Sequence, residues 1–442
     1  MRKGLAWAIA LLALPASIAA QAQKQQMPPL PPPSGPAAPP AAAQNAATRI
    51  TLDEALRLAV QHNHALQAAR STILQNQAEE VTANLRPNPT LSWDTQFFPL
   101  FTPSQFTANY LENDAQFDLG IGYLFERGKK RQHRLQAARD QTAVTRSQVD
   151  DDERQLLFNT GSQFIAVLLA QSTLDLAKQD VDSFRQTVDI SEARYKVGDM
   201  SESDLLKIKL QLLQFQSDLS AAKLAKVQAL TALRQFLGFE SVPDEFDVEG
   251  ELDYQAVHAD LQDLKVLAMQ DRPDLRAAQQ GVTAARSQEA LTEANGKKDL
   301  GVTFDYTHTG GINSGAFYFN IDLPIFDRNQ GEIARSRYAI TQSEQQAIET
   351  AQQVSTDVVD AYAALHSNDE IIQLYRGGYV DQAKQSRDIT EYAYKRGAAS
   401  LLDFLDAERT YRANQLAYRQ ALASYMTALE QVRQAVGTRN LP

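Results

Sequence analysis

The sequence predicts a mixed α/β membrane protein, built mainly from long α-helical coiled coils with four β-strands. Three observations lead to this fold class. After its N-terminal segment the sequence consists of two similar halves, an internal repeat. Each half contains long polar segments almost free of proline. Each half also contains two segments in which apolar and polar residues alternate. The expected order in each half is helix, strand, strand, long helix, turn, long helix.

Composition and motifs exclude several function classes. The 442 residues carry 43 Lys and Arg against 54 Asp and Glu, a net charge of −11, which argues against nucleic acid as the main partner. The absence of cysteine excludes disulfides, thiolate metal sites and lipidation of an N-terminal cysteine. No nucleotide-binding, zinc-protease or serine-hydrolase motif is present. The segment 311–315 comes nearest to the serine-hydrolase pattern G-x-S-x-G, but its spacing is wrong, and we expect it to form an exposed loop between two strands. We therefore predict no enzyme activity, catalytic residue, metal site or cofactor.

The amino terminus reads as a targeting segment. Arg2 and Lys3 precede the apolar run 5–14, and the small residues Ala20 and Ala22 form a cleavage pattern. We interpret residues 1–22 as a signal peptide and 23–48 as a Pro/Ala-rich linker, with ordered structure from about Ile50. No later run approaches 18 apolar residues, so strands closed into a barrel would have to cross any membrane.

The repeat defines the domain organisation. The pattern Y-K-x-G-x-x-S-x-x-D-x-L occurs without a gap from Tyr195 and again from Tyr394. Two further matches, His64 with Pro273 and Leu124 with Ile325, lie in the same order. The predicted parts are a first repeat 49–240, a connector 241–262, a second repeat 263–437 and a tail 438–442.

The helices are expected to be long. The first should span 52–85, and uninterrupted helices should span 127–196 and 329–395, each running roughly 100 Å at 1.5 Å per residue. The helices that return after each turn carry apolar stripes at 3,4 spacing, which is typical of left-handed coiled coils. Only Lys226 and Asn414 interrupt these stripes. The stripe positions are Leu205, Ile208, Leu212, Phe215, Leu219, Ala222, Lys226, Ala229, Leu233 and Phe236, and then Phe404, Ala407, Tyr411, Asn414, Tyr418, Ala421, Tyr425, Ala428, Val432 and Ala435.

The strands are expected to face two different solvents. Alternation over nine to eleven residues with many aromatics fits a lipid-facing wall, while the alternative is a half-buried sheet in a soluble core. Four strands cannot close a barrel, because about eight are needed, so the membrane interpretation requires oligomerisation. The expected lumen residues are Asp94, Asp118, Asp305 and Asp322, which predict a cation-selective pore. The expected lipid-facing residues are Leu91, Trp93, Phe97, Phe117, Leu119, Ile121, Tyr123, Val302, Phe304, Tyr306, Phe317, Phe319 and Ile321.

Several of these segments together resemble outer-membrane efflux channels of the TolC type. The segment 52–63 is similar to the L-x-E-A-L-x-x-A-x-x-x-N start of that family, as are 272–275, 323–326 and both turn motifs. The resemblance implies a homotrimer in the outer membrane of a Gram-negative bacterium, with a 12-stranded β-barrel and an α-helical periplasmic tunnel. It also implies a passive exit duct of a tripartite efflux system, working with a periplasmic adaptor (membrane fusion) protein and an inner-membrane pump of the RND type.

The resemblance also assigns roles near the two turns. Asp403 and Asp406 match the paired carboxylates that constrict family entrances, and Tyr394 and Asp204 match residues that hold the entrance shut. Lys207 would neutralise the carboxylates across helices. In the TolC-type family an arginine also helps to hold the entrance shut, and its position corresponds to Ala399 here. Arg396 is the nearby arginine that could replace it. Adaptor-docking positions, or alternatively simple turn residues, are Gly198, Ser201, Gly397 and Ser400.

The exported solute follows from a shorter pattern. The segment 122–131 resembles the heavy-metal-exporting branch of the family, which indicates divalent heavy-metal cations among the small solutes. Two other functions stay open. One is a type I protein-secretion channel in the outer membrane, and the other is a soluble periplasmic coiled-coil scaffold.

Overall fold

The computed structural model describes residues 48–97, 99 and 101–441. The predicted signal peptide and the linker up to residue 47 lie outside these residues. The first strand begins at Thr48, two residues before the expected start at Ile50. Within the described ranges, no helix has a stretch long and apolar enough to span a membrane.

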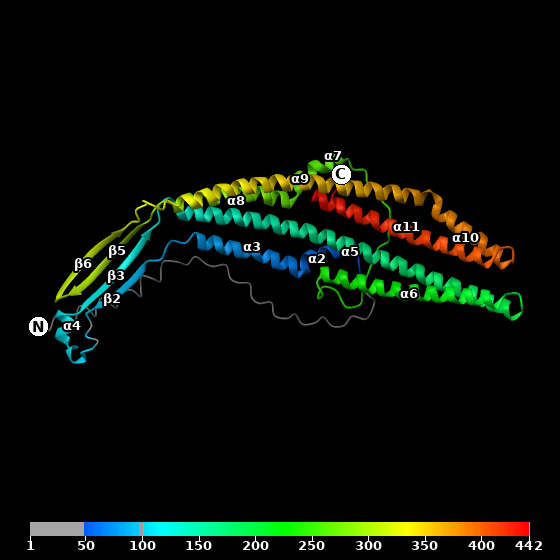
Figure 1. The fold of residues 1–442 in the computed structure, drawn as a ribbon, viewed down its shortest axis with the longest axis horizontal. Coiled ribbons are helices and arrows are strands. Elements are labelled where there is room, and N and C mark those ends of the chain that lie inside the picture. The colour runs from blue at the N-terminus through cyan, green and yellow to red at the C-terminus, as the bar shows by residue number, and fades with distance from the viewer. Residues whose placement is uncertain (1–47, 98, 100, 442) are drawn as a thin grey trace. The chain divides into compact units, whose positions relative to one another are not determined.

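The first half of the described chain runs from β1 to β4 and contains the longest helix, α5 (Figure 1). A short parallel pair, β1 with β4, was not predicted and joins the start of the first half to the connector. The elements are β1 (Thr48–Ile50), α2 (Leu52–His62), α3 (His64–Ala83), β2 (Thr90–Gln96), η1 (Pro103–Gln105), α4 (Ala108–Asn113), β3 (Gln116–Phe125), α5 (Lys130–Lys196), α6 (Glu202–Leu237) and β4 (Phe246–Val248).

The second half repeats this order without the helices between its strands. A two-residue turn replaces them, because Gly310 and Gly311 have φ angles of 57° and 73° that suit a tight hairpin. The elements are α7 (Leu261–Asp271), α8 (Pro273–Asn295), β5 (Leu300–Thr309), β6 (Ile312–Asn320), α9 (Gln330–Leu374), η2 (Tyr375–Tyr379), α10 (Val380–Lys395) and α11 (Leu401–Val436).

The first helix of each half is broken at the same place. The single helix expected over 52–85 is wrong, because Asn63 adopts φ −65° and ψ 117° and its side chain caps the backbone N–H of Leu66 at 3.0 Å. The matching residue of the second half, Arg272, has φ −67° and ψ 122° and precedes Pro273. A residue before proline avoids the helical region, so the second break follows from the sequence.

The two long helices differ. The prediction for the first is confirmed, because α5 runs over 67 residues without interruption. The prediction of one helix over 329–395 is wrong, because a single π-helical turn interrupts it at 375–379. There Gly378 takes a φ of 106°, which only glycine adopts without strain.

The four strands form one antiparallel sheet in the order β2-β3-β5-β6. Its register confirms the alternating strands but shortens two of them. Phe97 follows β2 with a φ of 60°, and Ile321 and Asp322 lie beyond the end of β6. The expected loop over 311–315 is also wrong, because β6 begins at Ile312 and pairs with β5 from there.

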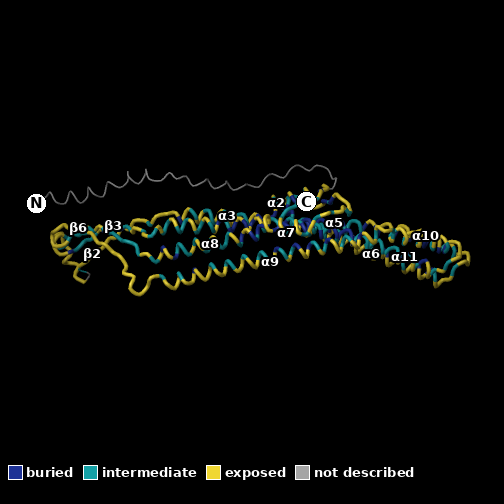
Figure 2. Tube along the Cα trace, turned by 90° about the horizontal axis from the view of Figure 1, so that it is seen from above, coloured by how far each residue is buried: buried dark blue, intermediate teal, exposed yellow. Residues whose placement is uncertain are grey.

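The helices continue the order of the strands. Next to the sheet, the helices lie side by side in the order α3, α5, α8 and α9. Near the two helix-to-helix turns, the side-by-side order is α6, α5, α11 and α10. Buried residues gather in the middle of the helical part, and the strands and turns are mostly exposed (Figure 2). None of the predicted stripe positions on α6 and α11 is exposed, so the coiled-coil prediction is confirmed.

Candidate functional site

The two helix-to-helix turns have the same backbone geometry. Gly198 and Gly397 have φ angles of 80° and 75°, and an added Cβ would meet no heavy atom within 4 Å at either. The N–H of Asp199 donates to the carbonyl of Arg194 at 2.9 Å, and Ala398 donates to Ala393 at 2.8 Å. These are Schellman-type endings, in which a left-handed glycine lets the chain reverse out of the helix.

A serine begins the returning helix after each turn. The Ser201 side chain accepts from the backbone N–H of Asp204 at 3.1 Å, and Ser400 accepts from that of Asp403 at 3.2 Å. Only the second turn has the reciprocal bond, in which Asp403 accepts from the backbone N–H of Ser400 at 3.2 Å. Both serines therefore hold the turns together whether or not a partner docks there.

The carboxylates near the turns differ in their contacts. Hydrogen bonds from the side chain and backbone of Ser400 hold the pKa of Asp403 below its usual range. Asp406 lies one turn further along the exposed face, and within the described part of the chain no ion pair involves it. Within the single chain, Lys207 pairs with Asp204 of its own helix at 3.2 Å. Its expected neutralisation of the carboxylates across helices stays a prediction.

Tyr394, one of the two residues matched to the closure of the entrance, is buried inside the chain. It is 8% exposed, and its ring stacks on Phe404 with centroids 5.2 Å apart and planes at 5°. Burial raises the pKa of its hydroxyl. Arg396 lies over the ring of Tyr392 instead, 5.0 Å from its centroid, while the guanidinium above Tyr394 at 5.6 Å belongs to Arg194. The substitution by Arg396 is therefore not seen here.

An ionic cluster that the sequence did not indicate joins the two halves deeper in the bundle. Arg412 of α11 lies 2.9 Å from Asp180 of α5 and 2.6 Å from Asp218 of α6. Beside them Glu408 lies 3.8 Å from Arg387 of α10. The only sequence signal was charge at positions flanking the apolar stripes, and local spacing cannot pair residues of different helices.

Burial makes this cluster unusual. Asp180 is 7% exposed and Glu408 is 8% exposed, and burial raises the pKa of both carboxyl groups although Arg412 and Arg387 oppose the rise. The residues border a cavity of about 540 Å³ between α5, α6 and α11. In the described ranges, this cluster included, no three His, Asp or Glu side chains are grouped to hold a metal ion.

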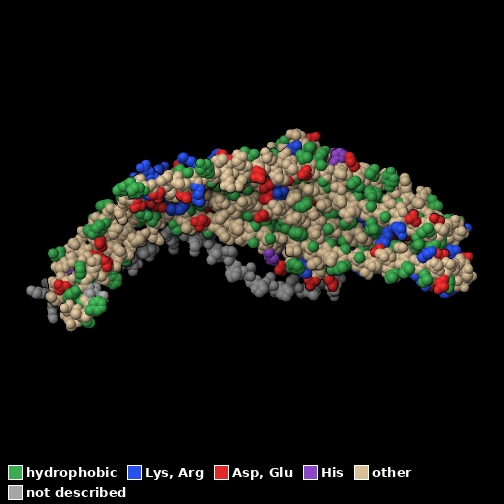
Figure 3. Space-filling model, in the orientation of Figure 1, with side chains coloured by type: hydrophobic (Ala, Val, Ile, Leu, Met, Phe, Trp, Pro, Cys, Tyr) green, Lys and Arg blue, Asp and Glu red, His purple; other side chains and the backbone are tan. Residues whose placement is uncertain are grey.

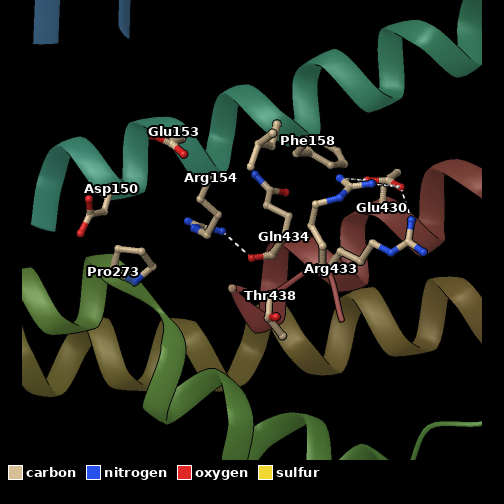
Figure 4. A pocket seen from close by; sticks show the side chains of 12 residues that line it. Asp150, Glu153, Arg154, Phe158, Pro273, Glu430, Arg433, Gln434 and Thr438 are labelled. Atoms are coloured by element: carbon tan, nitrogen blue, oxygen red, sulfur yellow. Dashed lines mark hydrogen bonds and ion pairs between the residues drawn. The ribbon is translucent and has the colours of Figure 1, made fainter. Parts of the chain in front are cut away.

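A second polar cluster fastens the carboxyl end of the chain to α5 (Figure 4). Glu430 is 3% exposed and pairs with Arg433 and with Arg439, the latter at 3.0 Å. Arg154 of α5 donates to the carbonyl of Gln434 at 2.6 Å and pairs with Asp151 at 2.7 Å. All carboxylates and guanidinium groups of this cluster have structural partners, so it serves packing rather than binding.

The sheet register places three of the predicted lumen carboxylates on one face. Asp94 pairs with Asp118, and Asp305 pairs with Gly120, so all three point to the same side. Asp322 lies outside the strand. On the other face, aligned apolar side chains are highly exposed, including Leu91 at 75% and Trp93 at 77%. The remaining predicted lipid-facing residues of the strands share that face, namely Phe117, Leu119, Ile121, Tyr123, Val302, Phe304, Tyr306, Phe317 and Phe319.

Comparisons with known proteins agree with this architecture. A family model described as outer membrane efflux protein matches residues 55–239 and 264–438. The chain is 26% identical over 410 residues to the cobalt-zinc-cadmium resistance protein CzcC of Cupriavidus metallidurans, covering 89% of this chain and 90% of that protein. It is 25% identical over 275 residues to the cation efflux system protein CusC of Escherichia coli, covering 58% of each. A crystal structure of CusC superposes with a TM-score of 0.72 at 18% identity, covering 90% of this chain and 96% of that one.

Proposed function

The chain belongs to the outer membrane efflux protein family and acts in efflux, and on that premise we propose that three copies form the exit duct of a tripartite system. The observation that carries the proposal is the family match across both halves. The fold is consistent with it, because the helices lie side by side in the same order as the strands from which they continue. The partners in this proposal are a periplasmic adaptor and an inner-membrane pump of the RND type.

The edges of the structure support assembly with further copies. In the sheet, β2 and β6 have a neighbour on one side only. In the helical part α3 and α6 lie on the side of β2, and α9 and α10 on the side of β6. Two unlike edges can meet head to tail, and such contacts form a ring where the rotation closes. Three copies of four strands supply the twelve strands of the barrel.

Exposed apolar side chains on the edge helices support the same assembly. Leu206, Leu210 and Leu213 of α6 are 54–65% exposed, and Leu224 and Val227 return to the same heptad register after exposed serines at its two intervening positions, 217 and 220. This second stripe lies apart from the one buried inside the chain. Exposed apolar side chains that share one helix face are typical of an interface, and heptad register fits another helix. On the opposite edge α10 exposes Ile389 and Tyr392. We assign the stripe to the neighbouring copy.

The turns form the periplasmic entrance in this proposal. Gly198, Ser201, Gly397 and Ser400 present the docking surface for the adaptor, and Asp406 contributes a carboxylate from each copy to a constriction. Asp403 supports that surface through its serine bonds. Tyr394 belongs to an apolar cluster with Phe184, Ile208 and Phe404, which holds the two hairpins of one chain together.

Divalent heavy-metal cations are the proposed solutes. The resemblance of 122–131 to the heavy-metal branch and the names of the relatives CzcC and CusC support this assignment. The carboxylates Asp94, Asp118 and Asp305 on one face of the sheet would favour cations in the lumen. A passive duct needs no dedicated metal ligands.

The proposal is tested by deleting the gene in the organism that encodes the chain. Sensitivity to cobalt, zinc and cadmium should rise and should return to normal when the chain is restored. Unchanged metal sensitivity with loss of a secreted polypeptide would instead support the protein-secretion channel. A mature chain that stays monomeric in detergent-free buffer would support the soluble scaffold and contradict the duct.

A further inference from the structure

Three separate loops meet where the strands end and the helices begin. The backbone N–H of Arg127 donates to Asp299 at 2.9 Å, and Lys130 pairs with the same carboxylate at 2.7 Å. A Cβ added to Gly128 would lie 2.6 Å from Cδ of Lys297. Asn329 donates to the carbonyl of Thr292 at 2.8 Å, which brings the third loop to the same place. Segments 126–134, 296–299 and 326–329 therefore form one surface, which we name the collar.

The collar is strongly positive in a chain of negative net charge. Its three segments contain eight Lys and Arg but only three Asp and Glu, whereas the whole chain carries −11. Figure 3 shows Lys and Arg side chains gathered beside the junction of strands and helices. Two of the cations are used internally, Lys130 by Asp299 and Arg134 by Glu126 at 2.9 Å. Among described residues, the other six have no carboxylate partner: Arg127, Lys129, Arg131, Lys297, Lys298 and Arg328.

Exposed apolar side chains border the collar on the side of the strands. Phe125 at the end of β3 is 50% exposed, and Ile325 and Phe326 after β6 are 62% and 90% exposed. Aromatic and aliphatic side chains next to lysines and arginines are typical of the boundary between hydrocarbon and headgroups. The ten-residue strands β3 and β5 have the length needed to span a bilayer, so residues at their ends lie at headgroup depth.

We propose that the collar binds the phosphate headgroups of anionic glycerophospholipids in the periplasmic leaflet of the outer membrane. This inference rests on the proposed function, which places the strands in that membrane with the helices on the periplasmic side. Six unpaired cations per chain attract an anionic leaflet, and long lysine side chains reach phosphate while their stems cover apolar surface. Two of the three collar carboxylates, Asp299 and Glu126, are already paired with Lys130 and Arg134, so only Asp327 is left to compete with phosphate for the six cations.

The test is reconstitution of the full chain in vesicles of phosphatidylethanolamine with a minor fraction of phosphatidylglycerol. The protein is then extracted in mild detergent, and the retained lipids are quantified. The wild type should retain phosphatidylglycerol above its share in the vesicle. The variant Lys129→Gln/Lys297→Gln should lose about fivefold or more of that enrichment. The matched control, Lys265→Gln/Lys384→Gln, removes two lysines that lie outside the collar and lack ion pairs among the described residues.

Several results would overturn the inference. Equal enrichment in both double variants would do so, as would complete displacement of the lipid by inorganic phosphate at the same ionic strength, which would mean that the collar binds free phosphate. A stronger cation preference in Lys129→Gln/Lys297→Gln with unchanged lipid retention would place these side chains in the pore. A chain that enters no vesicle and conducts no ions fails the proposed function itself, whereas a conducting chain without lipid enrichment fails only this inference.

Discussion

The guanidinium of Arg412 lies 2.9 Å from the carboxylate of Asp180, and this pair joins the second half of the chain to the first. Both residues are largely buried, between helices that each carry their own apolar stripe. The contact lies between the two hairpins whose tips form the proposed entrance. Movement of one hairpin against the other would have to separate these charges, so the pair favours the packing of the two hairpins that this chain shows.

Replacing Arg412 should destabilise the hairpins. Arg412→Ala leaves Asp180 buried without its partner and also removes the contact with Asp218, so we expect a loss of about 3 kcal/mol in the free energy of unfolding. Chemical denaturation with hydrogen exchange of the hairpin amides measures it. Arg409→Ala is the control, because Arg409 is exposed and has no ion pair within the described residues. Equal effects of the two substitutions would contradict this account.

The buried Glu408 should make stability depend on pH. Burial raises the pKa of Glu408, so the folded chain holds its proton more tightly than the unfolded chain. The resulting stabilisation is present at low pH and is lost as pH rises from the ordinary glutamate value through the raised one. Glu408→Gln should remove that part of the slope, while Asp180, whose pKa burial also raises, keeps the remainder.

Denaturation midpoints measured over this pH window test the prediction. The control is Glu349→Gln, an exposed glutamate without an ion pair in the described ranges. It should leave the slope as it is in the wild type. A slope that Glu408→Gln does not alter would show that Arg387 and Arg412 keep this carboxylate ionised in the folded chain.

The turn glycines should tolerate alanine only at the cost of backbone strain. Gly198 and Gly397 have positive φ with no heavy atom near an added Cβ, so Gly→Ala at either should cost about 1 kcal/mol. Gly281 also has open space but lies inside α8, so Gly281→Ala should stabilise by about 0.5–1 kcal/mol. Thermal unfolding of the three variants gives the comparison. A stabilising effect at the turns would be incompatible with the left-handed geometry.

Divalent block should depend on Asp406 more than on Asp403. In planar bilayers we expect a cation-selective conductance that millimolar divalent or trivalent cations block. Asp406→Asn should relieve the block, because that carboxylate is exposed and no described residue pairs with it. Asp403→Asn should chiefly weaken the capping of α11 by Ser400. A chloride-favouring reversal potential, or block unaffected by Asp406→Asn, would disprove the assigned roles.

The sequence by itself determined the type and order of the long helices and strands and the family, although not the helix breaks at Asn63 and Gly378. The 3,4 stripes gave the coiled coils, because side chains three and four residues apart share a helix face, and period-two alternation gave the strands for the corresponding reason. The repeated turn motif predicted two glycine turns, and their φ angles of 80° and 75° confirm them. The resemblance to outer-membrane efflux channels is confirmed by the family match.

Only the tertiary structure decided which distant residues meet. It buried Tyr394 against Phe404 and placed Arg412 between carboxylates of two other helices. It also brought the three loops of the collar together from different parts of the chain. Periodicity fixes the face of a helix on which a residue lies, but rotation and depth against the neighbouring helix decide its partner, and these depend on packing of the whole bundle.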